Sequence, residues 1–190
     1  MYQEAIFDKT FEKVNFTANP LNSKDYDNCV FIDCNFSKGN LSNINFVDCR
    51  FVACDLGLVN LHNTGLKTVL FEACKMIGIV FSNCSDFLFS VNIIDSQLDM
   101  SSFYNMTLKS SRFEGCKLEE VDFSEADLRG VIIDNCDFNR AIFDGTRLDK
   151  VDFRSAENYS IDPEANFIVG ARFSLQGIVG LLDKYKIHIG

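Results

Sequence analysis

A large apolar residue recurs at every fifth position of this chain, and this period constrains the fold more than any other feature. From Phe11 to Phe81, every residue reached in steps of five is large and apolar. After a slip of two residues, the ladder resumes at Leu88 and continues to Phe153. A period of five fits neither an α-helix, at about 3.6 residues per turn, nor a flat strand, at about 2. The chain must therefore turn in five-residue steps.

A second ladder lies two residues before each large residue and consists mostly of Val, Cys, Ala and Ser. The other three positions of each step carry mainly Asp, Asn, Ser, Lys, Arg and Glu. Two inward positions, one large and one small, with three outward positions describe a chain that turns a corner every five residues.

Twenty-residue coils with four sides explain how the large residues are ordered. Every fourth large residue then stacks on one face, and like residues fall together. One face holds Phe11, Phe31, Phe51, Phe71, Ile93, Phe113, Ile133 and Phe153, a second holds Leu21, Leu41, Leu61, Phe81, Phe103, Phe123 and Phe143, and a third holds Tyr26, Phe46, Leu66, Leu88, Leu108, Leu128 and Leu148. The stacks stay in phase across the slip, which predicts a bulge near residues 84–88 rather than a domain boundary.

The stretches Val121-Asp122-Phe123-Ser124-Glu125 and Ala126-Asp127-Leu128-Arg129-Gly130 resemble the repeats of the pentapeptide-repeat family. The resemblance covers about residues 10–158. It implies an all-β fold, a right-handed quadrilateral parallel β-helix with four repeats per coil. We expect residues 1–160 to form this β-helix and residues 161–190 to form a separate C-terminal segment.

The five-residue pattern fades after Phe153, and the tail has a different character. Ser174 is a suitable N-cap for a helix over about Leu175 to Lys184, and Lys186 to Ile189 alternates like a short strand. An apolar helix and strand at the end of a rod form either a cap or a dimer contact. The segment from Gly180 to Ile189 resembles the C-terminal module of Qnr-type pentapeptide-repeat proteins, which joins two rods tail to tail. The resemblance implies a homodimer. The expected dimer contacts are Ile178, Leu181, Leu182, Tyr185, Ile187 and Ile189.

The eight cysteines all fall on the small inward position. Their spacing lacks the Cys-x-x-Cys pairs of zinc sites, and a buried free cysteine behaves as a small hydrophobic residue. We therefore expect reduced thiols that fill the core, with no metal. Reduced thiols and the absence of a signal-peptide pattern or a long apolar run favour a cytoplasmic protein away from membranes.

Composition and motifs argue against an enzyme and against direct binding of nucleic acid. The chain carries 27 acidic and 18 basic residues, a formal charge of −9, whereas phosphate backbones require a basic surface. It has no glycine-rich phosphate loop, and its two histidines, His62 and His188, have no plausible nucleophile beside them. We expect no catalytic residues and no cofactor.

Two outer faces are candidate binding surfaces. The face of Leu61 carries Asn40, Asn60, Asn43, Asn63 and Asn83, followed by Asp122, Glu125 and Asp144, with no Lys or Arg on its regular positions. These side chains form either an asparagine ladder that hydrogen-bonds at the corners or an anionic stripe that imitates a nucleic-acid backbone. The face of Phe11 points apolar residues outward, namely Val30, Ile32, Val52, Leu70 and Ile94, either toward a partner or beneath the N-terminal segment around Ile6 and Phe7.

The resemblance to Qnr-type proteins implies a DNA-mimicking protein that binds type II topoisomerases, DNA gyrase and topoisomerase IV, and protects them from fluoroquinolones or modulates them. Many Qnr proteins use long projecting loops for this, whereas the interruption here is short, at Ser85-Asp86-Phe87. The expected partner-binding residues are Asp86, Phe87, Asp122, Glu125 and Asp144. The alternative is a scaffold or adaptor with a different protein partner.

Overall fold

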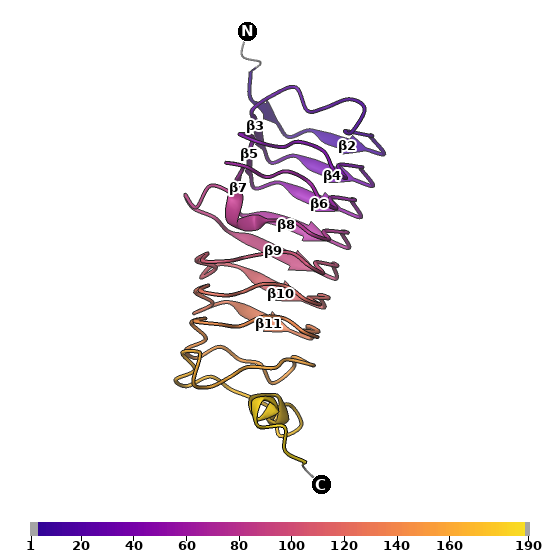
Figure 1. Ribbon diagram of the computed structural model, residues 1–190. Coiled ribbons are helices and arrows are strands. Elements are labelled where there is room, and N and C mark those ends of the chain that lie inside the picture. Colours follow the sequence, from indigo (N-terminus) through magenta and orange to yellow (C-terminus); the bar gives the residue numbers. More distant parts are fainter. Residues whose placement is uncertain (1–3, 189–190) are drawn as a thin grey trace.

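The computed structural model describes residues 4–188, and these residues wind into stacked parallel coils (Figure 1). Seven strands form one sheet: β2 (Thr10–Glu12), β4 (Val30–Ile32), β6 (Arg50–Val52), β8 (Val69–Glu72), β9 (Val91–Ile94), β10 (Arg112–Glu114) and β11 (Ile132–Asp134). Four strands form another: β1 (Ile6–Phe7), β3 (Asp25–Asp27), β5 (Asn45–Val47) and β7 (Gly65–Lys67). All pairs are parallel, and Phe31 pairs with Phe51, which confirms the predicted coil of twenty residues.

The two ladders of the sequence form the core. Phe31, Phe46, Leu66 and Phe103 are at most 1% exposed, as is the small residue Cys49. Rings in successive coils stack face to face, with centroids 4.7 Å apart for Phe31 and Phe51 and 4.4 Å apart for Phe81 and Phe103. This spacing is close to the ~4.8 Å that separates hydrogen-bonded strands, so one repeat distance serves both backbone and side chains. The chain contains 19 Phe residues, and stacking of their rings at the spacing of the coils gives this high Phe content a structural cause.

The corners depend on residues that tolerate unusual backbone angles. The second residue after a large inward residue often has a positive φ, as in Asn28, Asp33 and Asn43. Asn and Asp enter this left-handed region more readily than other residues with a side chain. Asn and Asp also precede the large residues, where the side-chain oxygen accepts a hydrogen bond from the amide two residues later, as in Asn35 to Ser37 at 2.9 Å. The polar residues of each repeat therefore turn the chain.

The two-residue slip is a local insertion, as predicted, but one residue was misplaced. Val69 of β8 pairs with Val91 of β9, so the coil here contains 22 residues instead of 20. The insertion follows a 3₁₀-helix, η1 (Phe81–Asn83). The prediction that Leu88 points into the core is wrong, because Leu88 is 66% exposed and Phe89 is 8% exposed in its place. The four-stranded sheet ends at β7, and on that side of the next coil the insertion takes the place of a further strand.

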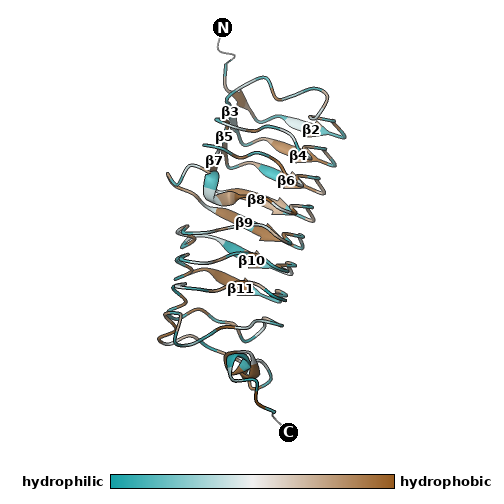
Figure 2. Ribbon diagram, viewed as in Figure 1, coloured by the Kyte–Doolittle hydropathy of each residue, from teal (hydrophilic) through white to brown (hydrophobic). Residues whose placement is uncertain are grey.

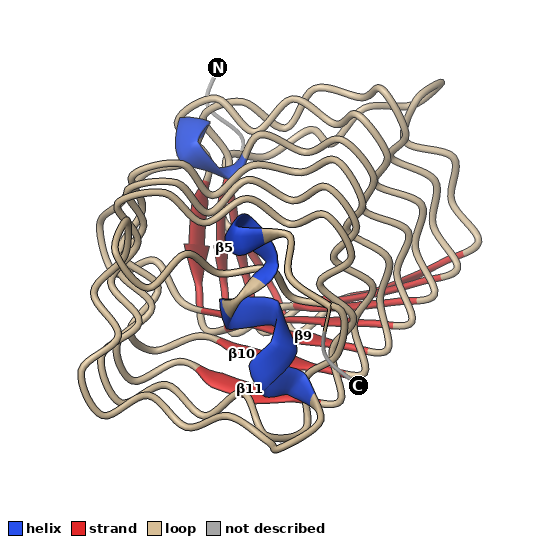
Figure 3. Cartoon of the chain, turned by 60° about the horizontal axis from the view of Figure 1, so that its bottom comes forward, coloured by secondary structure: helices blue, strands red, loops and turns tan. Residues whose placement is uncertain are grey.

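Residues 161–173 still belong to the coils, because Phe167 bridges to Arg147 and Arg172 bridges to Asp152. The rest of the C-terminal segment, from Ser174 to His188, lies across the end of the last coil, as the view from that end shows (Figure 3). It contains two 3₁₀-helices, η2 (Gly177–Leu181) and η3 (Asp183–Tyr185), so the predicted helix from Leu175 to Lys184 is wrong in type and extent. Ser174 still behaves as a cap, because its Oγ accepts a hydrogen bond from the amide of Gly177 at 2.9 Å. Lys186 to His188 form no strand, and Ile189 lies outside the described residues.

A glycine explains why this segment is not a regular α-helix. Gly180 touches the backbone of Tyr159, and its carbonyl oxygen accepts a hydrogen bond from the amide of Ile161 at 3.0 Å. Close docking of backbone on backbone selects glycine at this position, and glycine is a poor helix former.

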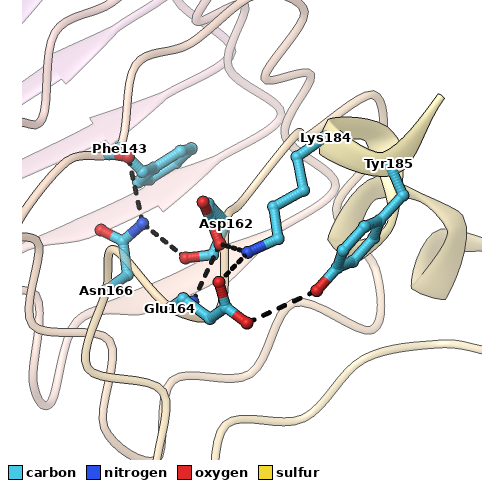
Figure 4. A network of polar contacts seen from close by, with 6 residues as sticks. All are labelled: Phe143, Asp162, Glu164, Asn166, Lys184 and Tyr185. Carbon is cyan, nitrogen blue, oxygen red and sulfur yellow. Dashed lines mark hydrogen bonds and ion pairs between the residues drawn. The ribbon is translucent and has the colours of Figure 1, made fainter.

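Polar side chains fasten the segment to the body of the protein (Figure 4). The Lys184 Nζ lies 2.7 Å from Asp162 Oδ1 and 2.6 Å from Glu164 Oε2. The side chain of Asn166 donates to the carbonyl oxygens of Phe143 and Asp162, at 3.1 and 3.0 Å, and so ties residue 162 to the coil beneath. We call Asp162, Glu164 and Lys184 the C-terminal clamp.

In the seven-stranded sheet, strands β9 and β11 are more hydrophobic than β10 (Figure 2). Val30, Ile32, Val52, Leu70 and Ile94 are half-buried. The N-terminal segment does not cover them, because Ile6 pairs with Tyr26 in the other sheet. The alternative that Ile6 and Phe7 shield this face is therefore wrong.

Candidate protein-binding face

The N-terminal half of the Leu61 face is an asparagine ladder. We define the Leu61 face as the five-residue segments centred on Leu41, Leu61, Phe81, Phe103, Phe123 and Phe143. Asn63 Nδ2 donates to Asn43 Oδ1 at 2.9 Å, one coil away. The side-chain oxygens of Asn40 and Asn60 accept from amides two residues later, both at 3.0 Å. These asparagines form hydrogen bonds at the corners, in agreement with the first of the two alternatives from the sequence, the asparagine ladder.

The C-terminal half of the same face is acidic. Asp122 and Glu125 belong to one coil and Asp144 to the next, and the amide of Glu125 donates to the carbonyl oxygen of Asp144 at 2.7 Å. Glu125 and Asp144 are exposed, and Asp122 is half-buried while its Oδ1 accepts from the amide of Ser124 at 2.9 Å. The structure thus brings these three predicted residues together. The face carries no Lys or Arg from residue 39 to residue 145, so no basic side chain of the face itself neutralises them.

The insertion places the other two predicted residues differently. Asp86 is exposed and borders a hollow of about 590 Å³ together with Asn63, Tyr104 and Asn105, at the edge of the Leu61 face. Phe87 is 64% exposed and lies on the neighbouring side, where the Lys67 Nζ is 4.8 Å from the centre of its ring. Asp86 therefore borders the Leu61 face, whereas Phe87 contacts a residue of the four-stranded sheet.

The predicted dimer residues differ in exposure. Ile178, Tyr185 and Ile187 are 47%, 54% and 57% exposed, whereas Leu181 and Leu182 are half-buried and Leu181 packs against the core. Ile189 lies outside the described residues. Sequence reasoning missed Leu175 and Val179, which are also exposed. The tail therefore divides into residues that dock on the last coil and residues that face outward.

The thiols lie where the repeat predicted, with one exception. Seven cysteines are buried, and Cys84, beside the insertion, is only partly so. Burial raises the pKa of the Cys49 and Cys84 thiols to about 12 in each case. Within residues 4–188, no three His, Cys, Asp or Glu side chains are grouped closely enough to hold a metal ion. The thiols contribute packing and weak hydrogen bonds, such as that from Cys74 Sγ to the Phe51 carbonyl at 3.3 Å.

Sequence reasoning also missed exposed apolar side chains on and beside the Leu61 face. Leu58, Val80, Met100, Tyr104 and Ile142 are each 45% to 64% exposed. All five occupy outward positions of the repeat, so the signal was an apolar residue at a position that is usually polar. No helix in the described part of the chain is long and apolar enough to cross a membrane.

Solved structures of known proteins are similar to this chain. The full-length QnrB1, a plasmid-mediated fluoroquinolone resistance protein, is similar in structure with a TM-score of 0.57 and 16% identity, over 97% of this chain and 100% of that one. HetL, a pentapeptide repeat protein involved in heterocyst differentiation regulation in the cyanobacterium Nostoc, gives a TM-score of 0.44 and 15% identity, over 90% of this chain and 88% of its own. The likeness to QnrB1 shows a common fold. Among curated protein sequences, none matches this chain.

Two sequence profiles match the coiled part of the chain. The profile of the pentapeptide repeat region matches residues 24–103, and the profile of pentapeptide repeats in nine copies matches residues 88–157. Together they cover the stretch in which the structure turns a corner every five residues, and the chain therefore belongs to the pentapeptide-repeat family.

Proposed function

We propose that this chain is a non-enzymatic protein whose Leu61 face imitates DNA toward a type II topoisomerase, DNA gyrase or topoisomerase IV, and so protects the enzyme from fluoroquinolones or modulates it. One observation carries the proposal: the face lacks Lys and Arg over six coils and ends in Asp122, Glu125 and Asp144. Enzymes that hold DNA present basic grooves, and an acidic rod of regular repeat complements such a groove. The structural likeness to QnrB1 is consistent with this role.

A dimer through the C-terminal ends strengthens the proposal. Ile178, Tyr185 and Ile187 are exposed on the docked tail, and exposed apolar groups favour burial against a partner. Two chains joined at these ends place their acidic halves next to each other, with the asparagine halves outermost. The dimer then carries acidic stretches on both sides of its centre, which neither chain has alone.

A second candidate function is a scaffold that binds some other protein. The observation that favours it is the asparagine half of the Leu61 face, because Asn43 and Asn63 hydrogen-bond to each other and carry no charge. A surface that imitates DNA along its whole length needs negative charge along its whole length. A scaffold has no such requirement.

A supercoiling assay tests the topoisomerase proposal. Purified gyrase, plasmid and ciprofloxacin are incubated with increasing amounts of the protein, and supercoiled and cleaved DNA are measured. We expect protection or inhibition that is lost in the triple variant Asp122→Asn, Glu125→Gln, Asp144→Asn. The matched control removes the same charge from other faces, with Asp33→Asn, Asp48→Asn and Glu157→Gln. If the wild-type protein neither protects, inhibits nor binds the enzyme, the topoisomerase proposal fails and the scaffold remains.

Light scattering tests the dimer. Deletion of residues 174–190 should convert a dimer into a monomer. Because this deletion also uncovers the last coil, the double variant Ile178→Glu, Ile187→Glu provides a second test at two exposed positions outside the C-terminal clamp. A dimeric mass that survives both changes removes the tail from the interface.

A further inference from the structure

Two exposed apolar residues, Leu58 and Met100, lie at the corner that borders the Leu61 face, and a third, Val80, lies beside that corner on the face itself. Leu58, Val80 and Met100 are 57%, 45% and 64% exposed and come from three successive coils. The amide of Leu58 donates to the carbonyl oxygen of Ile77 at 2.9 Å, and the amide of Gly78 donates to that of Asp99 at 2.9 Å. Residues 58, 78 and 100 therefore follow one another along the corner. We call Leu58, Val80 and Met100 the apolar seam.

Gly78 keeps the seam continuous. Its φ is +67°, and a side chain at this position would overlap the Cδ2 atom of Leu58. The side chain of Leu58 thus lies over the backbone of the next coil instead of beside another side chain. The exposed apolar surface runs from Leu58 across Gly78 toward Met100.

The seam continues into the acidic half of the face. Val80 bridges to Ser102, Ser102 to Asp122 and Asp122 to Ile142, so these residues form one column along the axis. Tyr104 and Ile142 add exposed apolar side chains on the same face, at 50% and 51%. Along the rod, an apolar stretch is therefore followed by a stretch in which apolar and acidic side chains are mixed.

We infer that the apolar seam and the acidic half of the Leu61 face together bind a cationic amphipathic segment of a partner protein. The inference rests on the proposed function in one respect, that the Leu61 face binds protein. Charge complementarity selects the partner, because Asp122, Glu125 and Asp144 have no basic neighbour on their own face. The apolar seam requires that the partner segment also carry apolar residues beside its basic ones. Imitation of a phosphate backbone requires only charge, so it gives no reason for exposed Leu and Met.

The dimensions of the surface suit a short helix. Three coil steps separate Val80 from Ile142, which corresponds to roughly 14 Å at about 4.8 Å per step. A helix rises about 1.5 Å per residue, so roughly ten residues span this distance. Across the face, Val80 and Ile142 precede the buried Phe of their coils, whereas Asp144 and Glu125 follow theirs, so apolar and acidic side chains lie along opposite edges. Such a helix lies along the rod with apolar residues toward the first edge and Lys or Arg toward the second, in the way that amphipathic helices occupy apolar grooves.

A peptide-binding titration tests the inference without any topoisomerase. The probe is a fluorescent 14-residue helix with Leu on one side and Lys on the other. Two control peptides replace every Lys by Glu or every Leu by Ser. Fluorescence anisotropy should show saturable binding of the Leu/Lys peptide and at least tenfold weaker binding of each control.

Variants locate the site. Leu58 and Met100 have φ values of +56° and +60°, which Asn adopts readily, so Leu58→Asn with Met100→Asn removes the apolar side chains without straining the corner. This variant should weaken peptide binding at least tenfold. The matched control is Leu88→Asn, because Leu88 is 66% exposed with φ of +58° and lies outside the seam. The triple acidic variant should also weaken binding and reduce its dependence on salt.

Two results overturn the inference: no saturable binding of the Leu/Lys peptide, or unchanged binding in the Leu58→Asn, Met100→Asn variant. Either result leaves the proposed function standing if the same protein still protects gyrase from ciprofloxacin. Conversely, peptide binding by a protein that has no effect on gyrase supports the inference and removes the topoisomerase as partner.

Discussion

Gly180 lies against the carbonyl oxygen of Tyr159, so closely that a Cβ atom at position 180 would overlap that oxygen. The obstacle is backbone and cannot rotate away. Gly180→Ala should therefore displace η2 from the last coil, break the hydrogen bond from the Ile161 amide to the Gly180 carbonyl, and lower the free energy of unfolding by roughly 1–3 kcal/mol. Chemical denaturation and hydrogen exchange of the Ile161 amide measure these effects. Ser160→Ala, at an exposed neighbouring position, is the control. Wild-type exchange at Ile161 in the Gly180 variant would contradict the docking geometry.

The C-terminal clamp should make attachment of the tail depend on pH. The side chain of Lys184 holds the pKa of Asp162 below its usual value. A carboxyl whose pKa is lower in the folded than in the unfolded chain stabilises the fold above the unfolded pKa, about 3.9 for Asp, and this contribution is lost as pH falls through the folded pKa. The protection of amides 177–185 against hydrogen exchange, measured relative to the intrinsic exchange rate at each pH, should therefore fall below about pH 4.

Lys184→Met separates the clamp from general acid effects. The variant should show lower protection across residues 177–185 at pH 7 and should lose the further fall in protection that is specific to acid. Lys109→Met removes an exposed lysine far from the clamp and should behave as the wild type. If protection falls in acid by the same amount in the Lys184 variant as in the wild type, the pH dependence does not come from the C-terminal clamp.

The insertion contains a pair of neighbouring residues with opposite environments. Phe89 is buried, so Phe89→Ala should cost about 3 kcal/mol of unfolding free energy or more. Leu88 is exposed with a positive φ, so Leu88→Asn should stay within about 0.5 kcal/mol of the wild type. Thermal or chemical denaturation of the two single variants measures both losses of unfolding free energy. A larger loss in Leu88→Asn than in Phe89→Ala would mean that Leu88, not Phe89, fills the core.

The contrast between Leu88 and Phe89 shows how far the sequence predicts this fold. The period of five predicts the length of the coil, the residues of the core and the inward positions of the cysteines, because each coil repeats the same packing arrangement. Inside the insertion the period is broken, and either of two adjacent apolar residues can fill the vacant place. Phe89 fills it while Leu88 takes a corner conformation, and only the three-dimensional course of the chain decides between them.

The tail and the apolar seam were less predictable, for different reasons. The apolar spacing of Ile178, Leu181 and Leu182 indicates a helix, but the close approach of Gly180 to Tyr159 is a tertiary contact that no local pattern contains. The repeat assigns Leu58 and Met100 to outward positions. The apolar surface that joins them, however, depends on Gly78 in the coil between them and on the stacking of three coils. The acidic residues Asp122, Glu125 and Asp144 were found because the repeat alone assigns them to one face.

Thiol chemistry provides a further test of the repeat. Burial raises the pKa of Cys49 and Cys84 to about 12, and the thiolate is the reactive form, so at pH 8 only about one in ten thousand of these groups is ionised. The native protein should therefore react slowly with a disulfide reagent such as DTNB at pH 8. All eight cysteines should react rapidly once guanidinium unfolds the chain. Cys84 is the only partly exposed cysteine in the described chain, so the slow native reaction should begin there and should largely disappear in Cys84→Ser. Rapid native labelling of Cys49 or Cys54 would mean that the coils open at these positions, which the packed core of stacked rings on either side does not allow.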